Sequence, residues 1–333
     1  MTASTYTSVH LAKRPKDVII PDETFTLKTN DIPKAADLKD GEVLFQSLYL
    51  SLDPAMRGWM NDTRSYVPPV GINETMRGAC IGIIKASKSP AFPTGSYAMG
   101  TVGWTEYAIV HSKTLQKVDI PQHGKLTDCP WLKAGDFVVV SGAAGATGSV
   151  VGQIAKIKGA RVLGIAGSED KVTWLKEGLG FDDALNYKDA EFPLKFKEAT
   201  KDYIDVFFDN VGGDILDLAL ARAKPHARFV ICGAISQYNS SKPQGPKNYL
   251  NIISQRIRME GFIVFDYASQ YAHARTDLAA WLSEGKIQRK ETIVQGGLTT
   301  AGEALVSLYK GSNTGKLLVE IVPQEQTTGK ASL

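Results

Sequence analysis

The pattern of hydrophobic and polar residues changes character at about residue 136. Before that point, short hydrophobic runs are separated by Gly and Pro, as in TFTLKTN, EVLFQSLYLSL, GACIGIIKAS and GSYAMGTVGWTEYAIV. Short runs rich in aliphatic and aromatic residues between turn residues are typical of β-strands. The first part of the chain is therefore predicted to be an all-β unit with irregular loops.

After this point, strand-like runs alternate with helical segments. The predicted strands are FVVV at 137, RVLGIA at 161, DALNY at 183, YIDVFF at 203, RFVICG at 228 and GFIVF at 261. The predicted helices cover residues 149–159, 168–179, 189–201 and 213–224, with two more at 276–286 and 299–311 before a last strand, KLLVEIV. Such alternation predicts a parallel sheet with crossover helices, so the fold class is α/β with a doubly wound Rossmann sheet and a second, β-rich domain.

Three glycines mark the first turn of this region. In FVVVSGAAGATGSVVG, Gly142, Gly145 and Gly148 follow a predicted strand and open a predicted helix. A tight turn, a close approach of the backbone to a pyrophosphate and close helix packing each favour glycine, and this context predicts a dinucleotide site. The helix start would present N–H groups and a positive dipole end to the phosphates. The alternative is a tight turn with no ligand.

The end of the second strand favours NADP over NAD. NAD-binding chains usually place an acidic residue there, where it accepts a hydrogen bond from the ribose 2′-hydroxyl. Here RVLGIA ends in Gly167 and Ser168, and Lys171 follows. Small residues and a cation suit a 2′-phosphate, although Lys171 can also be read as a solvated helix-face lysine beside Glu169 and Asp170.

Composition and charge narrow the class of protein. A net charge of +3, from 38 basic and 35 acidic residues without a basic run, gives no reason to expect nucleic acid as a partner. No apolar run is long enough to span a bilayer, and the N-terminus shows no signal peptide. Three cysteines without a C-x-x-C pair favour a reducing compartment, so a cytoplasmic location is expected.

Several motifs together resemble one enzyme family. They are the glycine turn, NYKD at 186, FDNVGG at 208, ICGAISQYN at 231, RMEGFIV at 258, GSNTGK at 311 and LSLDPAMRGWMND near the N-terminus. The chain resembles the zinc-free medium-chain dehydrogenases/reductases, in the branch of leukotriene B4 12-hydroxydehydrogenases, prostaglandin reductases and alkenal double-bond reductases. The resemblance covers nearly the whole chain.

The resemblance implies a GroES-like catalytic domain at residues 1–128 and 314–333 and a Rossmann domain at 129–313. It implies NADPH-dependent reduction of the C=C bond of small α,β-unsaturated ketones or aldehydes, and a homodimer. By motif, the pyrophosphate would lie on Gly145, Ala146, Thr147 and Gly148; Lys171 and Tyr187 would hold the 2′-phosphate; Asn210 would touch the ribose; and the remaining cofactor contacts would come from Cys232, Gly233, Ala234, Ile235, Ser236, Tyr238, Phe262, Ile263, Val264 and Asn313.

Two of these positions have plainer readings. Cys232 fits a small buried hydrophobic residue better than a reactive thiol. Asn313, within GSNTG, has the composition of an ordinary turn. No metal is expected, because the three cysteines and five histidines are scattered and show no ligand spacing.

The chain departs from the family pattern in three places. Ala55 replaces a tyrosine in the family's Asp-Pro-Tyr-Met-Arg motif, and Ser254 replaces a tyrosine found in many members near the reacting enone. The segment of residues 112–137 is about half the family's length and lacks its Gly-Leu-Thr-Ala-Tyr run. These departures keep open an alternative: an NADPH-binding member whose activity is lost or repurposed.

The loss of the usual tyrosine leaves the proton donor to other residues. Tyr249 is the main candidate for the catalytic acid, with Tyr66 and Tyr238 as alternatives, since a phenol can donate to a developing enolate. Met56, Tyr66 and Phe265 are candidates for the substrate wall.

Overall fold

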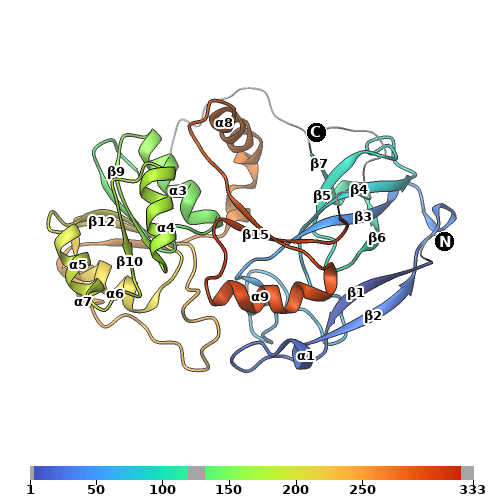
Figure 1. Cartoon of the computed structure of the whole chain (residues 1–333), viewed down its shortest axis with the longest axis horizontal. Helices are drawn as coiled ribbons and strands as arrows, with labels where there is room; N and C mark the ends of the chain where they lie inside the picture. Colours follow the sequence, from blue (N-terminus) through green and yellow to red (C-terminus); the bar gives the residue numbers. More distant parts are fainter. Residues whose placement is uncertain (1–3, 119–131, 324–333) are drawn as a thin grey trace. The chain divides into compact units, whose positions relative to one another are not determined.

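The computed structural model describes residues 4–118 and 132–323. The chain divides into two compact units, Met1–Asp119 with Glu291–Leu333, and Ile120–Lys290 (Figure 1). Within the described residues, no helix is both long and apolar enough to cross a membrane.

The first unit is β-rich, as its sequence predicts. A seven-stranded sheet contains the path β14-β15-β3-β4-β5-β7, and its seventh strand, β6, lies off this path and pairs with β3. Strands β1 and β2 form a separate antiparallel pair. The strands are β1 (Thr5–Leu11), β2 (Phe25–Asp31), β3 (Glu42–Ser51), β4 (Cys80–Ser87), β5 (Tyr97–Gly100), β6 (Tyr107–His111), β7 (Gln116–Lys117), β14 (Glu291–Val294) and β15 (Lys316–Glu320). The helices are α1 (Pro21–Thr24), α2 (Met56–Trp59) and α9 (Ala301–Tyr309), with 3₁₀ turns η1 (Ala35–Asp37), η2 (Ser112–Thr114) and η5 (Leu298–Thr300).

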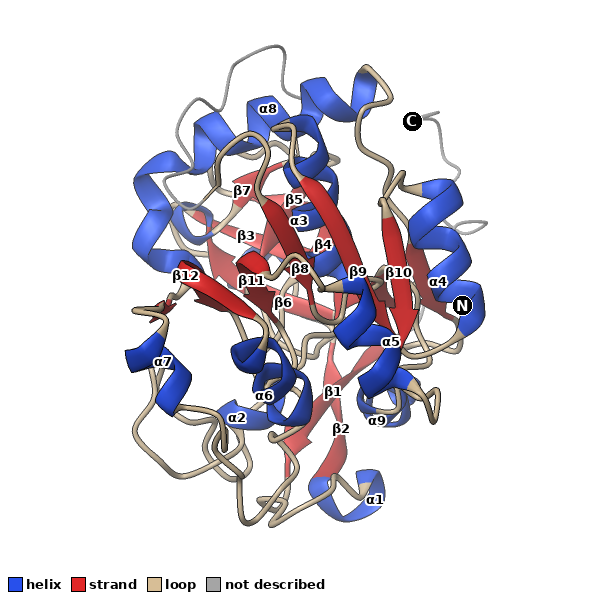
Figure 2. Ribbon diagram, turned by 90° about the vertical axis from the view of Figure 1, so that its left-hand side faces the viewer, coloured by secondary structure: helices blue, strands red, loops and turns tan. Residues whose placement is uncertain are grey.

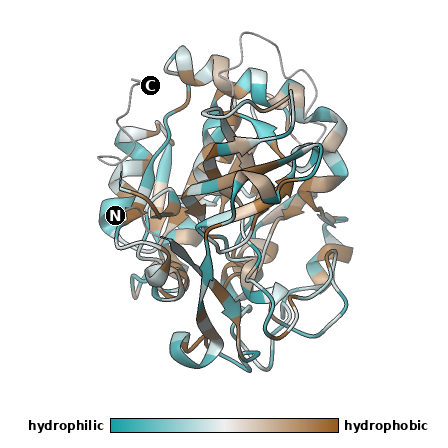
Figure 3. Ribbon diagram, turned by 90° about the vertical axis from the view of Figure 1, so that its right-hand side faces the viewer, coloured by the Kyte–Doolittle hydropathy of each residue, from teal (hydrophilic) through white to brown (hydrophobic). Residues whose placement is uncertain are grey.

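Strand β3 organises the core of this unit. It pairs with β4, β6 and β15, and its pairing with β4 is broken by bulges at Leu44/Phe45 and Ser47/Tyr49. A bulge shifts the alternation of side chains, which explains why buried residues in β3 are not strictly every second one. Figure 3 colours the ribbon by hydropathy, and brown marks the hydrophobic stretches.

The second unit is a doubly wound α/β sheet. Six parallel strands lie in the order β10-β9-β8-β11-β12-β13. They are β8 (Phe137–Val140), β9 (Arg161–Ala166), β10 (Asp183–Asn186), β11 (Ile204–Asp209), β12 (Ala223–Ile231) and β13 (Arg258–Gly261). The helices are α3 (Ala146–Ile157), α4 (Glu169–Thr173) continued by a π-turn η3 (Trp174–Gly178), α5 (Phe192–Ala199), α6 (Gly213–Ala221), α7 (Leu250–Ser254), a 3₁₀ segment η4 (Val264–Gln270) and α8 (Tyr271–Ser283).

Alternating side chains place a core on each face of this sheet. Figure 2 shows the strands of the sheet and the helices around them. In β8, Val138 and Val140 join one buried cluster with residues of α3 and η3, whereas Phe137 and Val139 join another with residues of α5 and α6. A strand buried on both faces reads as a continuous hydrophobic run, which is the pattern of FVVV. Because the strand order reverses between β8 and β11, a crevice for ligands is expected outside their carboxyl ends.

Two sequence predictions are corrected here. The strand predicted at 261–265 lies earlier, at β13, because Arg258–Gly261 pairs with Arg228–Ile231 of β12 and the chain turns into η4 from Val264. Residues 291–313 group with the first unit and not with the Rossmann unit, because β14 pairs with β15 and α9 joins the first core. Strand β1 was not predicted, since TYTSVHL contains many polar residues.

Candidate functional site

The glycine turn connects β8 to α3. Gly142 has φ +58°, a left-handed conformation that glycine adopts without strain, and its carbonyl accepts a 3.0 Å hydrogen bond from Gly145 N. Gly145 then precedes the helix in an extended conformation, and no side chain caps it. The first N–H groups of α3 have no acceptor within the helix, so they and the positive end of the helix dipole can face an anion.

Gly148 explains why the turn tolerates no side chain. A Cβ at this position would lie 2.4 Å from Gly142 O and 2.8 Å from Ala143 Cα, both backbone atoms. The first turn of α3 therefore packs directly on the loop that precedes it. This close packing of backbone is compatible with the approach of a pyrophosphate to the helix start.

The ends of β9 and β10 form a cationic rim. The ring of Tyr187, which follows β10, packs on Gly167, where a Cβ would lie 2.9 Å from Tyr187 Cε1. Burial, and then the charge of Lys188, lower the pKa of Lys171. Because the two positively charged ammonium groups repel each other, an anion bound near both would be stabilised. These residues are suited to a phosphate.

Asp209, the last residue of β11, ties three loops together. Its Oδ1 accepts hydrogen bonds from Ser141 Oγ at 2.7 Å, Val211 N at 2.9 Å and Gly212 N at 3.0 Å. Its main-chain carbonyl accepts from Cys232 N at 2.8 Å and from Gly233 N at 3.0 Å. The loops that follow β8, β11 and β12 thus share one residue at the point where the strand order reverses.

The carboxylate of Asp209 is completely buried, and its Oδ2 has no hydrogen-bond partner among the described residues. Burial raises the pKa of this carboxyl group, against the effect of the hydrogen bonds that it accepts. Asn210 extends the network, since its N–H donates to Ser141 Oγ and its Nδ2 donates to Ser141 O at 2.7 Å. Asp209 and Ser141 were not among the predicted site residues. The sequence signal for Asp209 is a carboxylate at the end of a predicted strand, directly before NVGG.

The loop after β12 is held by its own side chains. Tyr238 OH accepts a 3.0 Å hydrogen bond from Ala234 N, and Ser236 Oγ donates to Val211 O at 2.6 Å. Burial, followed by the charge of Asp209, raises the pKa of the Cys232 thiol, which fits the reading of this cysteine as an unreactive residue. Phe262 and Ile263 follow β13, so they too lie just past a carboxyl strand end, and Val264 begins η4.

The structure therefore brings most of the predicted cofactor residues to one edge of the second unit. They directly follow the carboxyl ends of β8, β9, β10, β11, β12 and β13 or lie in the first turn of α3 and in α4. Carboxyl ends of parallel strands share one edge of a sheet, which makes a single site of segments that are distant in sequence.

Four predicted residues lie elsewhere. Asn313 belongs to the first unit, where its Nδ2 donates to Gly315 O at 2.7 Å, a turn role. Met56 is fully buried in the first core, which does not fit a wall open to substrate. Tyr66 is half exposed and its hydroxyl accepts a 3.0 Å hydrogen bond from Trp59 Nε1. Tyr249 is exposed and immediately precedes α7.

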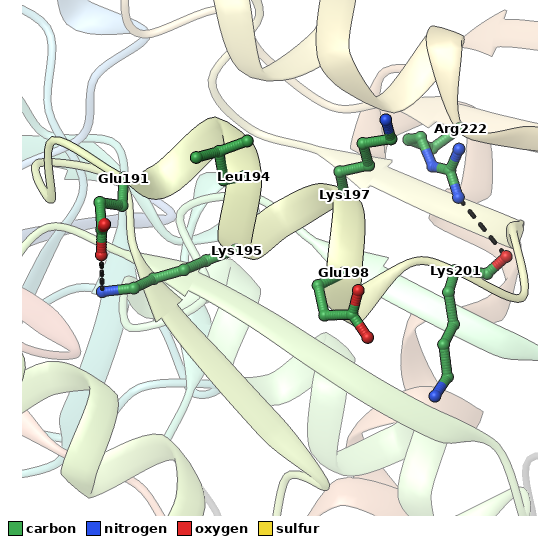
Figure 4. A pocket seen from close by; sticks show the side chains of 7 residues that line it. All are labelled: Glu191, Leu194, Lys195, Lys197, Glu198, Lys201 and Arg222. Carbon is green, nitrogen blue, oxygen red and sulfur yellow. Dashed lines mark hydrogen bonds and ion pairs between the residues drawn. The ribbon is translucent and has the colours of Figure 1, made fainter.

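Phe265, the remaining predicted substrate residue, follows Val264 in η4 and is 60% exposed. One other feature lies apart from this edge. A surface hollow of about 560 Å³ lies on α5 and is lined by Glu191, Leu194, Lys195, Lys197, Glu198, Lys201 and Arg222 (Figure 4). The carbonyl of Arg222 accepts from Ile204 N, the first residue of β11, so this side of the hollow lies toward the amino ends of the strands.

Residues 4–118 and 132–323 include the buried cysteine Cys80. Burial raises the pKa of Cys80 to about 12, so this thiol is unreactive. No group of three or more His, Cys, Asp or Glu side chains is placed to hold a metal ion in these ranges. Cys129 and the middle part of the short segment at 112–137, residues 119–131, lie outside the described residues.

Known proteins resemble this chain in sequence. The family model for the N-terminal domain of oxidoreductases matches residues 7–118, and the model for zinc-binding dehydrogenases matches residues 146–281. Prostaglandin reductase 1 of Bos taurus is 38% identical over 89% of this chain and 93% of its own length. The NADP(+)-dependent 2-alkenal reductase of Nicotiana tabacum is 36% identical over 92% of this chain and 93% of its own length.

A solved structure shows the same fold with a cofactor. CurA from Vibrio vulnificus in complex with NADPH superimposes with a TM-score of 0.85 and 37% identity, over 95% of this chain and 99% of CurA. The glycine turn and the cationic rim described above suit that cofactor. The chain belongs to the zinc-free medium-chain dehydrogenase/reductase family, in the branch of the prostaglandin and alkenal reductases, and it is an NADP(H)-dependent oxidoreductase.

Proposed function

We propose that this enzyme uses NADPH to reduce the C=C bond of α,β-unsaturated ketones or aldehydes, with hydride transfer to the β-carbon. The observation that carries the proposal is the backbone-lined turn at Gly142–Gly148 facing the same sheet edge as the cationic rim of Lys171 and Lys188. Relatives in this branch are reductases of conjugated small molecules by name, including the 2-alkenal reductase of tobacco.

The proposed roles of the chain's residues follow from their positions. Gly145, Ala146, Thr147 and Gly148 would hold the pyrophosphate on backbone N–H groups, and Lys171 with Tyr187 would hold the 2′-phosphate. Asn210, which Ser141 and Asp209 orient, would contact the ribose. When bound, the cofactor supplies the hydride.

The loop after β12 would shape the nicotinamide pocket. Residues 232–238 and Phe262, Ile263 and Val264 follow adjacent strands, and hydrogen bonds from Ala234 N to Tyr238 OH and from Ser236 Oγ to Val211 O keep the loop compact. A rigid wall excludes water and positions the substrate. Asn313 is proposed as a cofactor contact and Tyr66 as a substrate contact from the family motifs alone.

Tyr249 is proposed as the proton donor to the developing enolate, with Tyr66 as the alternative. Removing the donor's hydroxyl should lower kcat by about 10²-fold and leave the Kd of NADPH unchanged, because the hydroxyl is needed only for the proton transfer. Tyr249→Phe and Tyr66→Phe should be compared by steady-state kinetics. If neither lowers kcat, the proton comes from another group.

A second candidate function is favoured by Ser254. This residue stands where many relatives carry a tyrosine, and its hydroxyl is exposed in α7 and lies 3.4 Å from Asn251 Oδ1. A chain that binds NADPH but transfers no hydride to enones would also fit this substitution.

Two measurements separate these functions. NADPH is titrated by its fluorescence, and its oxidation is then followed by absorbance with a panel of enals and enones of different sizes. Binding followed by oxidation supports reduction of conjugated double bonds. Binding without oxidation on any member of the panel supports the second candidate, and failure to bind NADPH contradicts both.

We also propose that the enzyme is a homodimer that pairs through β13. This strand is the last in the sheet order, and exposed apolar side chains flank it, including Ile253 at 72% and Val264 at 56% exposure. An edge strand with an apolar border favours pairing with another chain. Light scattering should give twice the chain mass, and Ile253→Lys should give a monomer; a monomeric wild-type protein would contradict the proposal.

A further inference from the structure

The strands β9 and β10 end side by side, and the residue at the end of β10 makes an unexpected contact. Asn186, the last residue of β10, pairs with Ala166, the last residue of β9. After Ala166 the chain passes through Gly167 and Ser168 and enters α4 at Glu169. Glu169 is thus the first carboxylate after the second strand of the nucleotide-binding sheet.

A carboxylate near this strand end normally decides cofactor preference. It accepts a hydrogen bond from the ribose 2′-hydroxyl of NAD, and the same negative charge opposes the 2′-phosphate of NADP. Glu169 is exposed and long enough to turn toward such a ligand. An NADP-dependent chain therefore has to control where this side chain points.

The structure shows how Glu169 is controlled. Its Oε1 accepts a 2.8 Å hydrogen bond from Asn186 Nδ2. Asn186 is itself fixed, because its Oδ1 accepts a 3.0 Å hydrogen bond from Lys188 N. Both ends of the Asn186 amide are engaged, and Glu169 is held against the end of β10.

Two cations lie on the same rim. The charge of Lys188 lowers the pKa of Lys171, after the larger effect of burial, so the two ammonium groups are close enough to repel. The Nζ of Lys188 lies 5.9 Å from the ring centroid of Tyr187, and that ring covers Gly167. A carboxylate free to move among these groups would neutralise the rim.

We propose that Asn186 is a specificity-determining residue. By holding Glu169 against β10, it keeps the carboxylate from pairing with the rim lysines, so that the rim accepts a 2′-phosphate and disfavours a cofactor without one. This inference rests on the proposed binding of the 2′-phosphate at Lys171. Asn186 acts through Glu169 and is a positioning residue, with no contact to the reacting atoms.

The test uses the full-length chain and two nucleotides that differ only in the 2′-phosphate, 2′,5′-ADP and 5′-ADP, titrated by calorimetry. Asn186→Ala should weaken 2′,5′-ADP about tenfold and leave 5′-ADP unchanged or tighter, since a released carboxylate acts on the phosphate through charge. Glu169→Gln alone should change both affinities less than about twofold. Asn186→Ala/Glu169→Gln should recover the wild-type preference, because the released side chain is then neutral.

A purely structural role for Asn186 predicts a different result. If Asn186→Ala weakens both nucleotides equally, or if the added Glu169→Gln does not restore the ratio, the inference is overturned. Should Asn186→Ala fail to fold, Asn186→Asp keeps the acceptor for Lys188 N and repels Glu169, and it should shift the ratio in the same direction.

Lys171→Ala separates this inference from the site on which it rests. If that variant binds 2′,5′-ADP as the wild type does, the phosphate site itself is misplaced and the inference fails with it. If Lys171→Ala loses selectivity for 2′,5′-ADP while Asn186→Ala keeps it, only the role of Asn186 is wrong.

Discussion

Ser141 and Asp209 are joined by a buried 2.7 Å hydrogen bond across the point where the strand order of the nucleotide-binding sheet reverses. The same carboxylate oxygen receives the N–H groups of Val211 and Gly212. One side chain therefore sets the relative positions of the glycine turn after β8 and the turn after β11. The site depends on a residue that offers no surface to a ligand.

Asp209→Ala should therefore disturb both stability and cofactor binding. It leaves one hydroxyl and two N–H groups without their acceptor, and we expect the free energy of unfolding to fall by about 2–4 kcal/mol. The Kd of NADPH should rise about tenfold as the turns relax. Asp209→Asn, which keeps an acceptor oxygen, is the matched control, and it should lose much less by urea denaturation and by fluorescence titration.

The pH dependence of stability should also report on Asp209. Because burial raises its pKa in the folded state, the folded protein holds this proton to a higher pH than the unfolded chain does. The contribution of this group is therefore most favourable below its unfolded pKa of about 3.9 and declines as pH rises through the higher folded value. The difference in unfolding free energy between wild type and Asp209→Asn should shrink across that window; parallel curves would contradict the assignment.

Gly148→Ala should abolish NADPH binding. The added methyl group would lie 2.4 Å from Gly142 O, and neither backbone atom that it meets can move without opening the turn. Gly58→Ala is a suitable control, because Gly58 is also helical and a Cβ there would meet nothing within 4 Å. Equal NADPH affinities of the two variants would show that the turn does not receive the pyrophosphate.

Lys171→Ala should weaken NADPH by at least about tenfold and change NADH far less, because only NADPH carries the phosphate that the lysine would meet. Lys176→Ala is the control, since Lys176 is an exposed lysine of the neighbouring turn that pairs with Asp183 at 3.4 Å. Both cofactors should be titrated by fluorescence at one salt concentration. An equal loss for NADPH and NADH would remove Lys171 from the phosphate site.

Much of the second unit could be predicted from local pattern. FVVV and RVLGIA are strands at the predicted residues, because continuous hydrophobic runs between polar or glycine residues leave little choice of boundary. The run GFIVF is also continuously hydrophobic, and the strand predicted from it is wrong. The true strand, RMEG, lies at the sheet edge, where pairing with β12 and not burial fixes its position.

Only those residues of the candidate site that belong to a sequence motif could be predicted. Glycines and a lysine near strand ends show directly in the sequence, whereas Asp209 and Asn186 act through hydrogen bonds to residues 68 and 17 positions away. Such partners depend on which strands become neighbours, and a single sequence does not specify that. Met56 lies in the first core, where α2 places it, and its role as a wall residue stays a prediction.

The hydrogen bonds of Asp209 and of Asn186 involve separate sets of residues: Ser141, Val211 and Gly212 for the first, Glu169 and Lys188 for the second. Substitutions near the ends of β9 and β10 can therefore change coenzyme preference without disturbing the turns that Asp209 holds at the centre of the sheet. Coenzyme preference can thus be engineered, or can evolve, at one set of residues while the glycine turn that would bind the pyrophosphate stays the same.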